Sequence, residues 1–488
     1  MSALSLSLLA THFVLLFILC LFGLHRLSMV LRWLYYRKHT AVVQSEFNDL
    51  PKVTVQVPLY NEQFVARRVV DAVAALDYPT DKLQIQIIDD SNDETCDIIA
   101  EQVALYQQQG INIQHVQRSI RQGYKAGALK DAMQHSSGEF IAIFDADFLP
   151  QPSLLKDTIH HFTDSKVGML QFRWEHLNRD SSRLTETQAI LLDAHFGLEQ
   201  TVRFASGAFL NFNGTAGIWR ESAIIDSGHW CADTLTEDLD LSYRAQLRGW
   251  KMRYLNNVSC GGEIPADMNA FKSQQHRWAK GGIEVMLKML PKVWAAPIKL
   301  RYKIESSFHL ANNLAYLLML VDTIVFLIPS IWIRDQFNIE YIWWLDLPLL
   351  LLATGGHMAY LVFGQFALGR SRRNAILSIP RLFLIGIQLS FNNARAATEA
   401  LRGQSSEFVR TPKSGELKTA SANSQKGYKA VAPRGAFYEL LLAVIFSVVL
   451  AWGVVNQHWL MLPFVSFLVI GYASTAISSF ISYQQLKN

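Results

Sequence analysis

The chain has 488 residues, of which half are hydrophobic and only 18% are charged, and its formal net charge is +4. This length accommodates a catalytic domain and a separate membrane domain, and the apolar excess is larger than in ordinary soluble domains. The small charge without a long basic run argues against a nucleic-acid partner, and four cysteines without a Cys-x-x-Cys pair indicate no zinc or redox site.

The first hydrophobic run, about residues 4–24, is long enough to cross a bilayer. It has no positive segment before it and no small-residue cleavage site after it, so we interpret it as a retained anchor rather than a signal peptide. The basic residues that follow predict that the chain stays in the cytoplasm from there, with the N-terminus outside. Residues 1–50 are therefore expected to form the anchor and a linker.

Residues 51–301 have the alternating pattern of a soluble α/β domain. Short apolar runs at 53–57, 85–88 and 140–144 are typical of buried parallel strands. Helical patterns at 65–75 and 97–108 lie between them. This alternation predicts a doubly wound, Rossmann-like nucleotide-binding sheet.

Residues 302–488 are expected to form the main membrane domain. The runs at 310–333, 341–368, 437–455 and 459–483 can each span a bilayer, which makes five spans with the first. Residues 376–391 are also apolar, but a crossing there would put many basic residues outside, so we expect an interfacial helix. A polar loop at about 395–435 should be cytoplasmic.

Polar residues follow the three predicted strands. Tyr60 and Glu62 follow the first strand, and Asp89 and Asp90 follow the second, at the edge of a parallel sheet where ligands bind. Residues of these types are also common in turns, so they can be ligand-binding residues or simply turn residues. After the third strand, Asp145-Ala146-Asp147 offers two hard oxygen ligands for Mg²⁺ or Mn²⁺.

Three further motifs carry chemistry. Lys125, in the glycine-flanked segment 123–127 before a predicted helix, can meet a phosphate or remain a solvated lysine. In Thr236-Glu237-Asp238 a carboxylate can act as general base, although threonine followed by acids is equally a helix N-cap. In the segment 274–278, Arg277 can hold a phosphate and Trp278 can stack on a sugar, or the two can form a membrane-interface pair.

These motifs, in this order, resemble the processive branch of family 2 glycosyltransferases, the cellulose, chitin and hyaluronan synthases. The segments 123–129, 143–148, 212–219 and 274–278 are most similar to the plant cellulose-synthase-like A and C proteins, which make β-mannan or glucomannan and β-1,4-glucan backbones. The resemblance covers about residues 53–291. It implies a GT-A domain packed on transmembrane helices through interfacial helices.

The resemblance also implies a role for each motif. Metal ligands would be Asp145 and Asp147, the acceptor sugar would stack on Trp278, and Asp238 would be the catalytic base, flanked by Thr236 and Glu237. The nucleotide-sugar, UDP-glucose or GDP-mannose, would be bound by Tyr60, Glu62, Asp89, Asp90, Lys125, Gln274 and Arg277. A gating-like loop would include Phe408, Thr411 and Lys413, although Arg410 departs from the pattern of that loop in cellulose synthases.

The sequence therefore predicts a multi-pass membrane enzyme, of a bacterial inner membrane or of a Golgi or plasma membrane. Its predicted reaction is an inverting hexosyl transfer to a growing β-linked polysaccharide, coupled to export, with accessory export proteins as possible partners. One alternative is a non-processive transferase that glycosylates ceramide, diacylglycerol or polyprenyl phosphate. Another is a transport or assembly protein whose sugar-binding domain is inactive.

Overall fold

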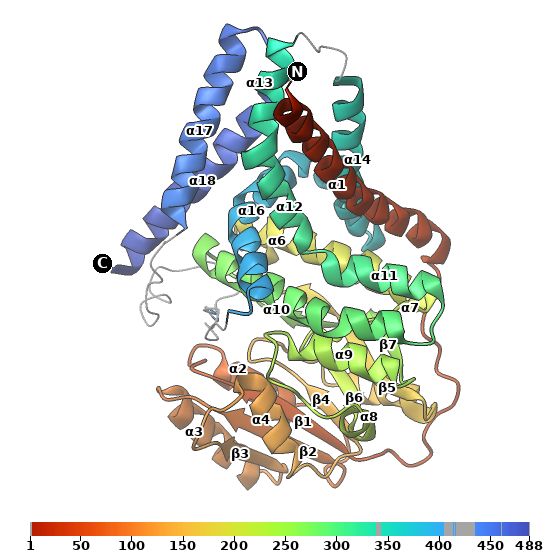
Figure 1. Ribbon diagram of the computed structural model, residues 1–488. Helices are drawn as coiled ribbons and strands as arrows, with labels where there is room; N and C mark the ends of the chain where they lie inside the picture. The colour runs from red at the N-terminus through yellow and green to blue at the C-terminus, as the bar shows by residue number, and fades with distance from the viewer. Residues whose placement is uncertain are drawn as a thin grey trace.

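The protein has a sheet domain at one end and long apolar helices at the other, with a layer of helices between them (Figure 1). The computed structural model describes residues 2–337, 343–404, 413, 415, 435–459 and 461–487. Two residues of the predicted gating-like loop, Phe408 and Thr411, lie outside the described residues. Lys413 is within them.

The sheet has seven strands in the order β3-β2-β1-β4-β6-β5-β7. The strands are β1 (Val53–Leu59), β2 (Leu83–Asp89), β3 (Ile113–Gln117), β4 (Phe140–Ile143), β5 (Val167–His176), β6 (Gly217–Arg220) and β7 (Lys251–Gly262). The three predicted strands are β1, β2 and β4, and they are parallel as expected. Since β6 runs antiparallel to β4 and β5, the complete sheet is mixed. The sequence pattern missed β3, because its residues are mostly polar and only its first is fully buried.

Helices cover both faces of this sheet. They are α2 (Ala66–Ala74), α3 (Thr95–Gln108), α4 (Tyr124–Met133), α5 (Leu154–Ile159), α8 (Glu221–Asp226) and α9 (Glu237–Leu247), with short helices η1 (His160–Thr163) and η2 (Arg179–Ser181). Alternate residues of β1, such as Val55, pack with α2, α3 and α5 in one core. On the opposite face, the buried side chain of Gln56 donates to Gln86 (2.9 Å), and Gln86 donates to a carbonyl of α4. The sheet is therefore buried on both faces, but polar side chains line one face of β1 and β2, so only β4 is a continuous apolar run.

The intermediate layer connects the sheet to the membrane helices (Figure 1). It consists of α6 (Arg183–Asp193), η3 (Ala194–Gln200), α7 (Thr201–Ser206), α10 (Met268–Ala295), α11 (Leu300–Ala311), α15 (Arg372–Leu377) and α16 (Ile379–Leu401). The predicted interfacial segment 376–391 falls mainly on α16. This helix packs on α10 from the sheet side and on α12 and α18 from the membrane side.

Among the described residues, five helical segments are long and apolar enough to cross a membrane. They are Ala3–Tyr36, Leu314–Gln336, Leu347–Ala367, Ala436–Val455 and Leu462–Ile481. These segments belong to α1 (Ala3–Tyr36), to α12 (Leu314–Val321) with η4 (Asp322–Leu327) and α13 (Ile328–Gln336), to α14 (Trp343–Ala367), to α17 (Ala436–Val455) and to α18 (Leu462–Lys487). Each corresponds to a predicted span. α16 is not among them, in agreement with its predicted interfacial character.

Candidate active site

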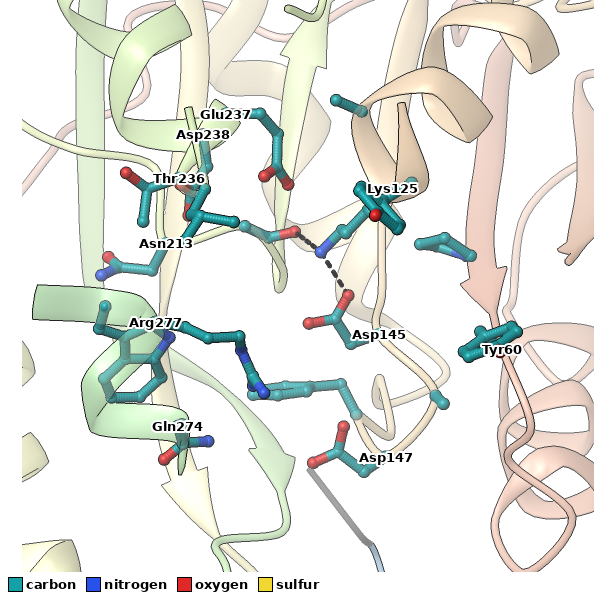
Figure 2. A pocket seen from close by; sticks show the side chains of 18 of the residues that line it. Tyr60, Lys125, Asp145, Asp147, Asn213, Thr236, Glu237, Asp238, Gln274 and Arg277 are labelled. Atoms are coloured by element: carbon teal, nitrogen blue, oxygen red, sulfur yellow. Dashed lines mark hydrogen bonds and ion pairs between the residues drawn. The ribbon is translucent and has the colours of Figure 1, made fainter. Parts of the chain in front are cut away.

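A cavity of about 520 Å³ lies at the carboxyl ends of β1 and β4, between the sheet and α10. It collects nearly all of the site residues expected from the sequence, several of which are drawn in Figure 2. The expected residues in its wall are Tyr60, Glu62, Asp90, Lys125, Asp145, Asp147, Thr236, Glu237, Asp238, Gln274, Arg277, Trp278 and Lys413. Motifs spread over more than 300 residues of sequence thus meet in one place.

The two acids that follow β2 have different surroundings. Asp89 is buried outside the cavity wall, where it accepts hydrogen bonds from the His115 ring (2.9 Å) and the Ser91 amide (2.9 Å). Burial alone would raise the pKa of Asp89, but these hydrogen bonds lower it. Asp90 borders the cavity and accepts from the Arg118 guanidinium (2.8 Å). Only the second acid of the pair is therefore in a position to meet a ligand.

An arginine that the sequence analysis did not single out packs on Tyr60. The guanidinium carbon of Arg121 lies 3.4 Å from the centroid of the Tyr60 ring and 4.9 Å from that of Tyr124. Arg118 and Arg121 belong to the loop before Gly123, whose positive φ of 74° leads into α4. Basic residues immediately before a glycine-flanked helix start were the available signal for this part of the site.

Lys125 is the central cation of the cavity (Figure 2). It lies in the first turn of α4, and its ammonium donates to Asp145 (2.5 Å) and to the carbonyl of Gly214 (2.8 Å). Burial acts to lower the pKa of Lys125, but the charges of Asp145, Glu237 and Asp238 outweigh it, so the pKa is raised. Lys125 therefore stays charged between the strand acids and the acids of α9.

Asp238 lies in the first turn of α9, where its carboxylate accepts from the Leu239 amide (2.8 Å). Burial, followed by the neighbouring charge of Glu237, raises the pKa of Asp238 to about 8, although Lys125 opposes this. Burial also raises the pKa of Glu237. A carboxylate that titrates near neutral pH is suited to accept and release a proton.

Thr236 occupies the N-cap position of α9, which was one interpretation of its motif, but its side chain makes no capping hydrogen bond. Within the described residues its hydroxyl is buried without a hydrogen-bond partner. Gly281 of α10 packs directly on it, since a Cβ atom at that position would lie 2.6 Å from Cγ2 of Thr236. The absence of a side chain at Gly281 thus lets α10 approach the start of α9.

Asp145 and Asp147 fit a divalent cation by their chemistry. Both are hard oxygen donors at the end of a strand, and each already neighbours a cation: Lys125 pairs with Asp145, and Lys413 pairs with Asp147. Asp147 also accepts from the Glu263 amide (2.9 Å), which holds its carboxylate in place. This end of the cavity is built to accommodate positive charge.

A second cluster, Cys231, Asp233 and Asp240, has ligand atoms within 4.8 Å of one another. The Lys288 ammonium lies 2.8 Å from both carboxylates of this cluster. Asp240 also accepts from Arg244 (2.8 Å), so two basic residues hold the acids of this cluster in an ion-pair network.

Helix α10 presents Gln274, Arg277 and Trp278 to the cavity. Burial lowers the pKa of Arg277 to about 10, so it still carries its charge near neutral pH. The Trp278 ring lies 6.5 Å from that of Trp174, centroid to centroid. Trp174 and His176 of β5 also line this end, and the sequence analysis missed both because it did not identify β5 as a strand.

Comparison with known proteins agrees with this architecture. Residues 51–281 match the family model "Glycosyltransferase like family 2". Over 251 residues, half of this chain, the sequence is 42% identical to glucomannan 4-beta-mannosyltransferase 1 of Oryza sativa subsp. japonica and 41% identical to glucomannan 4-beta-mannosyltransferase 2 of Arabidopsis thaliana. The match spans about half the length of these curated relatives, 48% and 47% respectively.

Among solved structures, the mannosyltransferase PcManGT from Pyrobaculum calidifontis, in complex with GDP-Man and Mn²⁺, is similar to this chain. The TM-score is 0.53 at 19% identity, and the similarity covers 81% of this chain and 99% of that one. At this identity the similarity concerns the fold, which is GT-A. The matched family model identifies residues 51–281 as a glycosyltransferase domain of family 2.

Proposed function

We propose that the chain is an integral membrane hexosyltransferase that adds mannose from GDP-mannose to a growing β-linked polysaccharide. The names of the two plant relatives support the mannosyl group and the polymeric product. The observation that carries the proposal is the placement of Asp238 in the first turn of α9, in the wall of the cavity. Asp238 shares one cavity with Lys125, the strand acids and the α10 residues.

For the donor, we assign the nucleoside to the end of the cavity with Tyr60, Glu62 and Asp90, and the diphosphate to Lys125, Gln274 and Arg277. Lys125 supports this because it lies at the start of α4, where a helix N-terminus favours an anion. Arg277 supports it because a charged guanidinium can form a two-pronged hydrogen bond with a phosphate. Asp89, which is buried on His115, would position Asp90 rather than touch the donor.

We assign a divalent cation, Mg²⁺ or Mn²⁺, to Asp145 and Asp147. When bound, it would supply positive charge that stabilises the diphosphate as a leaving group. Lys125 and Lys413 already neutralise these two carboxylates. A bound cation would share these carboxylates with the two ammonium groups, which could then turn towards the anionic donor.

The proposed chemical step is a single displacement. The acceptor hydroxyl gives its proton to the Asp238 carboxylate while its oxygen forms a bond to C1 of the sugar. The bond between C1 and the diphosphate oxygen breaks, and its electron pair leaves with the diphosphate, so the configuration at C1 inverts. Glu237 acts by holding the pKa of the base high, and Trp278 provides an aromatic face for the acceptor sugar.

The proposal places the sheet domain on the cytoplasmic side, because basic residues follow the first apolar helix in the sequence. The growing chain would leave between the membrane helices next to α10 and α16. Accessory export proteins would act on the opposite side of the membrane.

The test is the incorporation of labelled sugar by the purified full-length protein in lipid vesicles with Mg²⁺ or Mn²⁺. GDP-mannose and UDP-glucose are supplied separately, and the product is sized and digested with linkage-specific glycanases. A high-mass product from GDP-mannose that a β-mannanase degrades supports the proposal. A high-mass product from UDP-glucose alone would overturn the assignment of GDP-mannose as the donor. A small organic-soluble product would point to a glycolipid transferase. No turnover of either donor would contradict the activity.

A further inference from the structure

A second groove lies away from the catalytic cavity, where α6 meets α15 and α16. Its volume is about 440 Å³, and its lining consists of Arg183, Glu186, Asn374, Leu377, Ser378 and Arg381. The first two residues come from α6 and the others from the segment that follows α14. Nothing in the proposed transfer reaction uses these residues.

The groove has an excess of positive charge. Its one acid, Glu186, is neutralised by Arg381 at 2.6 Å, and this hydrogen bond lowers the pKa of Glu186. Arg183 is exposed and forms no ion pair with any described residue. Arg372 and Arg373 of α15 are also exposed and have no ion-pair partner in the described part of the chain. The groove and its rim thus carry three arginines that form no ion pair within the described residues.

The position of the groove relates it to the bilayer. The apolar segment Leu347–Ala367 of α14 ends five residues before Arg372, and α15 and α6 both pack against α14. Directly beside the arginines, Ile376 and Leu377 are 54% and 65% exposed. At the end of a membrane helix, the lipid headgroups meet the acyl chains. Basic side chains there can face the headgroups while the neighbouring exposed apolar side chains face the acyl chains.

We propose that this groove binds the headgroup of an anionic phospholipid from the surrounding bilayer. Arg183, Arg381 and the Asn374 amide would donate hydrogen bonds to the lipid phosphate, and the acyl chains would lie along Ile376 and Leu377. A soluble phosphate would satisfy the arginines but leave these apolar side chains uncovered, so the observations favour a lipid.

A bound lipid is structurally connected to the catalytic cavity through α6. This helix begins at Arg183 in the groove and ends at Asp193. Asp193 accepts hydrogen bonds from Arg179 (2.5 Å) and from Gln365 of α14 (3.0 Å), and it lies 3.8 Å from the ring of His176. His176 is in the wall of the catalytic cavity. A headgroup that holds α6 and α15 together would therefore stabilise the part of the cavity wall that contains His176, at the same end as Trp278.

Binding is measured on the full-length protein in vesicles of phosphatidylcholine with and without phosphatidylglycerol. The retained lipid is identified by native mass spectrometry after mild detergent extraction, a readout that does not depend on turnover. The test variant is Arg183→Gln/Arg373→Gln. The matched control, Arg67→Gln/Arg248→Gln, removes two arginines from the sheet domain that are 53% and 56% exposed.

We expect the unmodified protein and the control to retain phosphatidylglycerol in preference to phosphatidylcholine, and the test variant to retain it about fivefold less for each arginine removed. Equal retention by the test and control variants would overturn the proposal. The proposal would also be overturned if soluble glycerol phosphate displaced the bound lipid at the same concentration as phosphatidylglycerol does. The site would then recognise a free anion rather than a lipid. A melting temperature of the test variant that equals that of the control excludes misfolding as the cause of a loss.

Discussion

Arg26 of α1 donates a hydrogen bond to Glu199 of η3, with 2.8 Å between Nη1 and Oε2, and both side chains are largely buried. The same carboxylate accepts from Tyr360 of α14 (2.9 Å) and from Arg203 (3.0 Å). A single acid of the intermediate layer therefore holds two membrane helices. The catalytic cavity is near this junction, because His195 contacts both Glu199 (3.4 Å) and Asn213 in the cavity wall (3.1 Å).

Replacement of this acid should destabilise the protein strongly. Glu199→Ala leaves Arg26 and Arg203 buried without their shared carboxylate, and loss of one partner of a buried ion pair costs about 3–5 kcal/mol. The melting temperature of the purified protein in detergent measures this. The control is Glu101→Ala, whose pair with Arg67 is more than half exposed, and it should change little. Equal melting temperatures of the two variants would refute the structural role of Glu199.

Asp238→Asn should lower kcat about 10²- to 10⁴-fold, because the amide cannot take up the proton of the attacking sugar hydroxyl. Donor binding, measured by calorimetry with GDP-mannose, should stay within a few-fold, since Lys125 and Arg277 remain. Asp226→Asn is the matched control, because its carboxylate is about half exposed, pairs with Arg248 and is not in the cavity wall. Near-normal turnover by the Asp238→Asn variant would exclude Asp238 as the catalytic base.

The pH profile of kcat/KM should have a rising limb near pH 8 in the free enzyme. Burial and the charge of Glu237 raise the pKa of Asp238 to about 8, so the base is mostly protonated at pH 7. Activity should then increase about fivefold from pH 7 to pH 8 and level off above pH 9. In Glu237→Gln the repelling charge is absent, so the limb should move to lower pH. A limb that stays in place would show that Glu237 does not set the pKa of the base.

Gly281→Ala should impair both stability and turnover. The new Cβ would lie 2.6 Å from Cγ2 and 2.8 Å from Oγ1 of Thr236, so α10 or the start of α9 must shift. Overpacking of this kind costs about 1–3 kcal/mol, and a displaced catalytic group costs rate. Gly386→Ala on α16 is the control, because a Cβ there meets nothing within 4 Å. Equal kcat and melting temperature for both variants would contradict the close contact.

Removal of divalent cations should abolish transfer, and addition of Mg²⁺ or Mn²⁺ should restore it. Asp147→Asn should raise the metal concentration needed for half-maximal activity at least about tenfold, because a neutral amide is a weaker ligand than a carboxylate. Binding of Mn²⁺ can be followed separately by electron paramagnetic resonance. Full activity in a chelator would exclude metal dependence.

Sequence patterns predicted the local features of the fold. The length of each apolar run identified the five candidate spans, and short runs between polar turns identified β1, β2 and β4. They did not identify β3, which is mostly polar, or the strands β5, β6 and β7. Strand pairing depends on long-range contacts that local hydrophobicity does not encode.

The candidate site was predictable as a set of residue types, because acids, a lysine and an Arg-Trp pair after strand ends have recognisable chemistry. Which of these residues share a cavity was decided by tertiary structure. Asp89 and Asp90 are adjacent in sequence, yet only Asp90 borders the cavity, since successive residues at a strand end point in opposite directions. The partners that tune the site, Arg121 on Tyr60 and Glu237 beside Asp238, act through distances and burial. The sequence by itself thus determined the apolar spans and the chemical groups. Only the packing of α4, α9 and α10 on the sheet decided which groups meet and with what pKa, because both depend on contacts between distant segments.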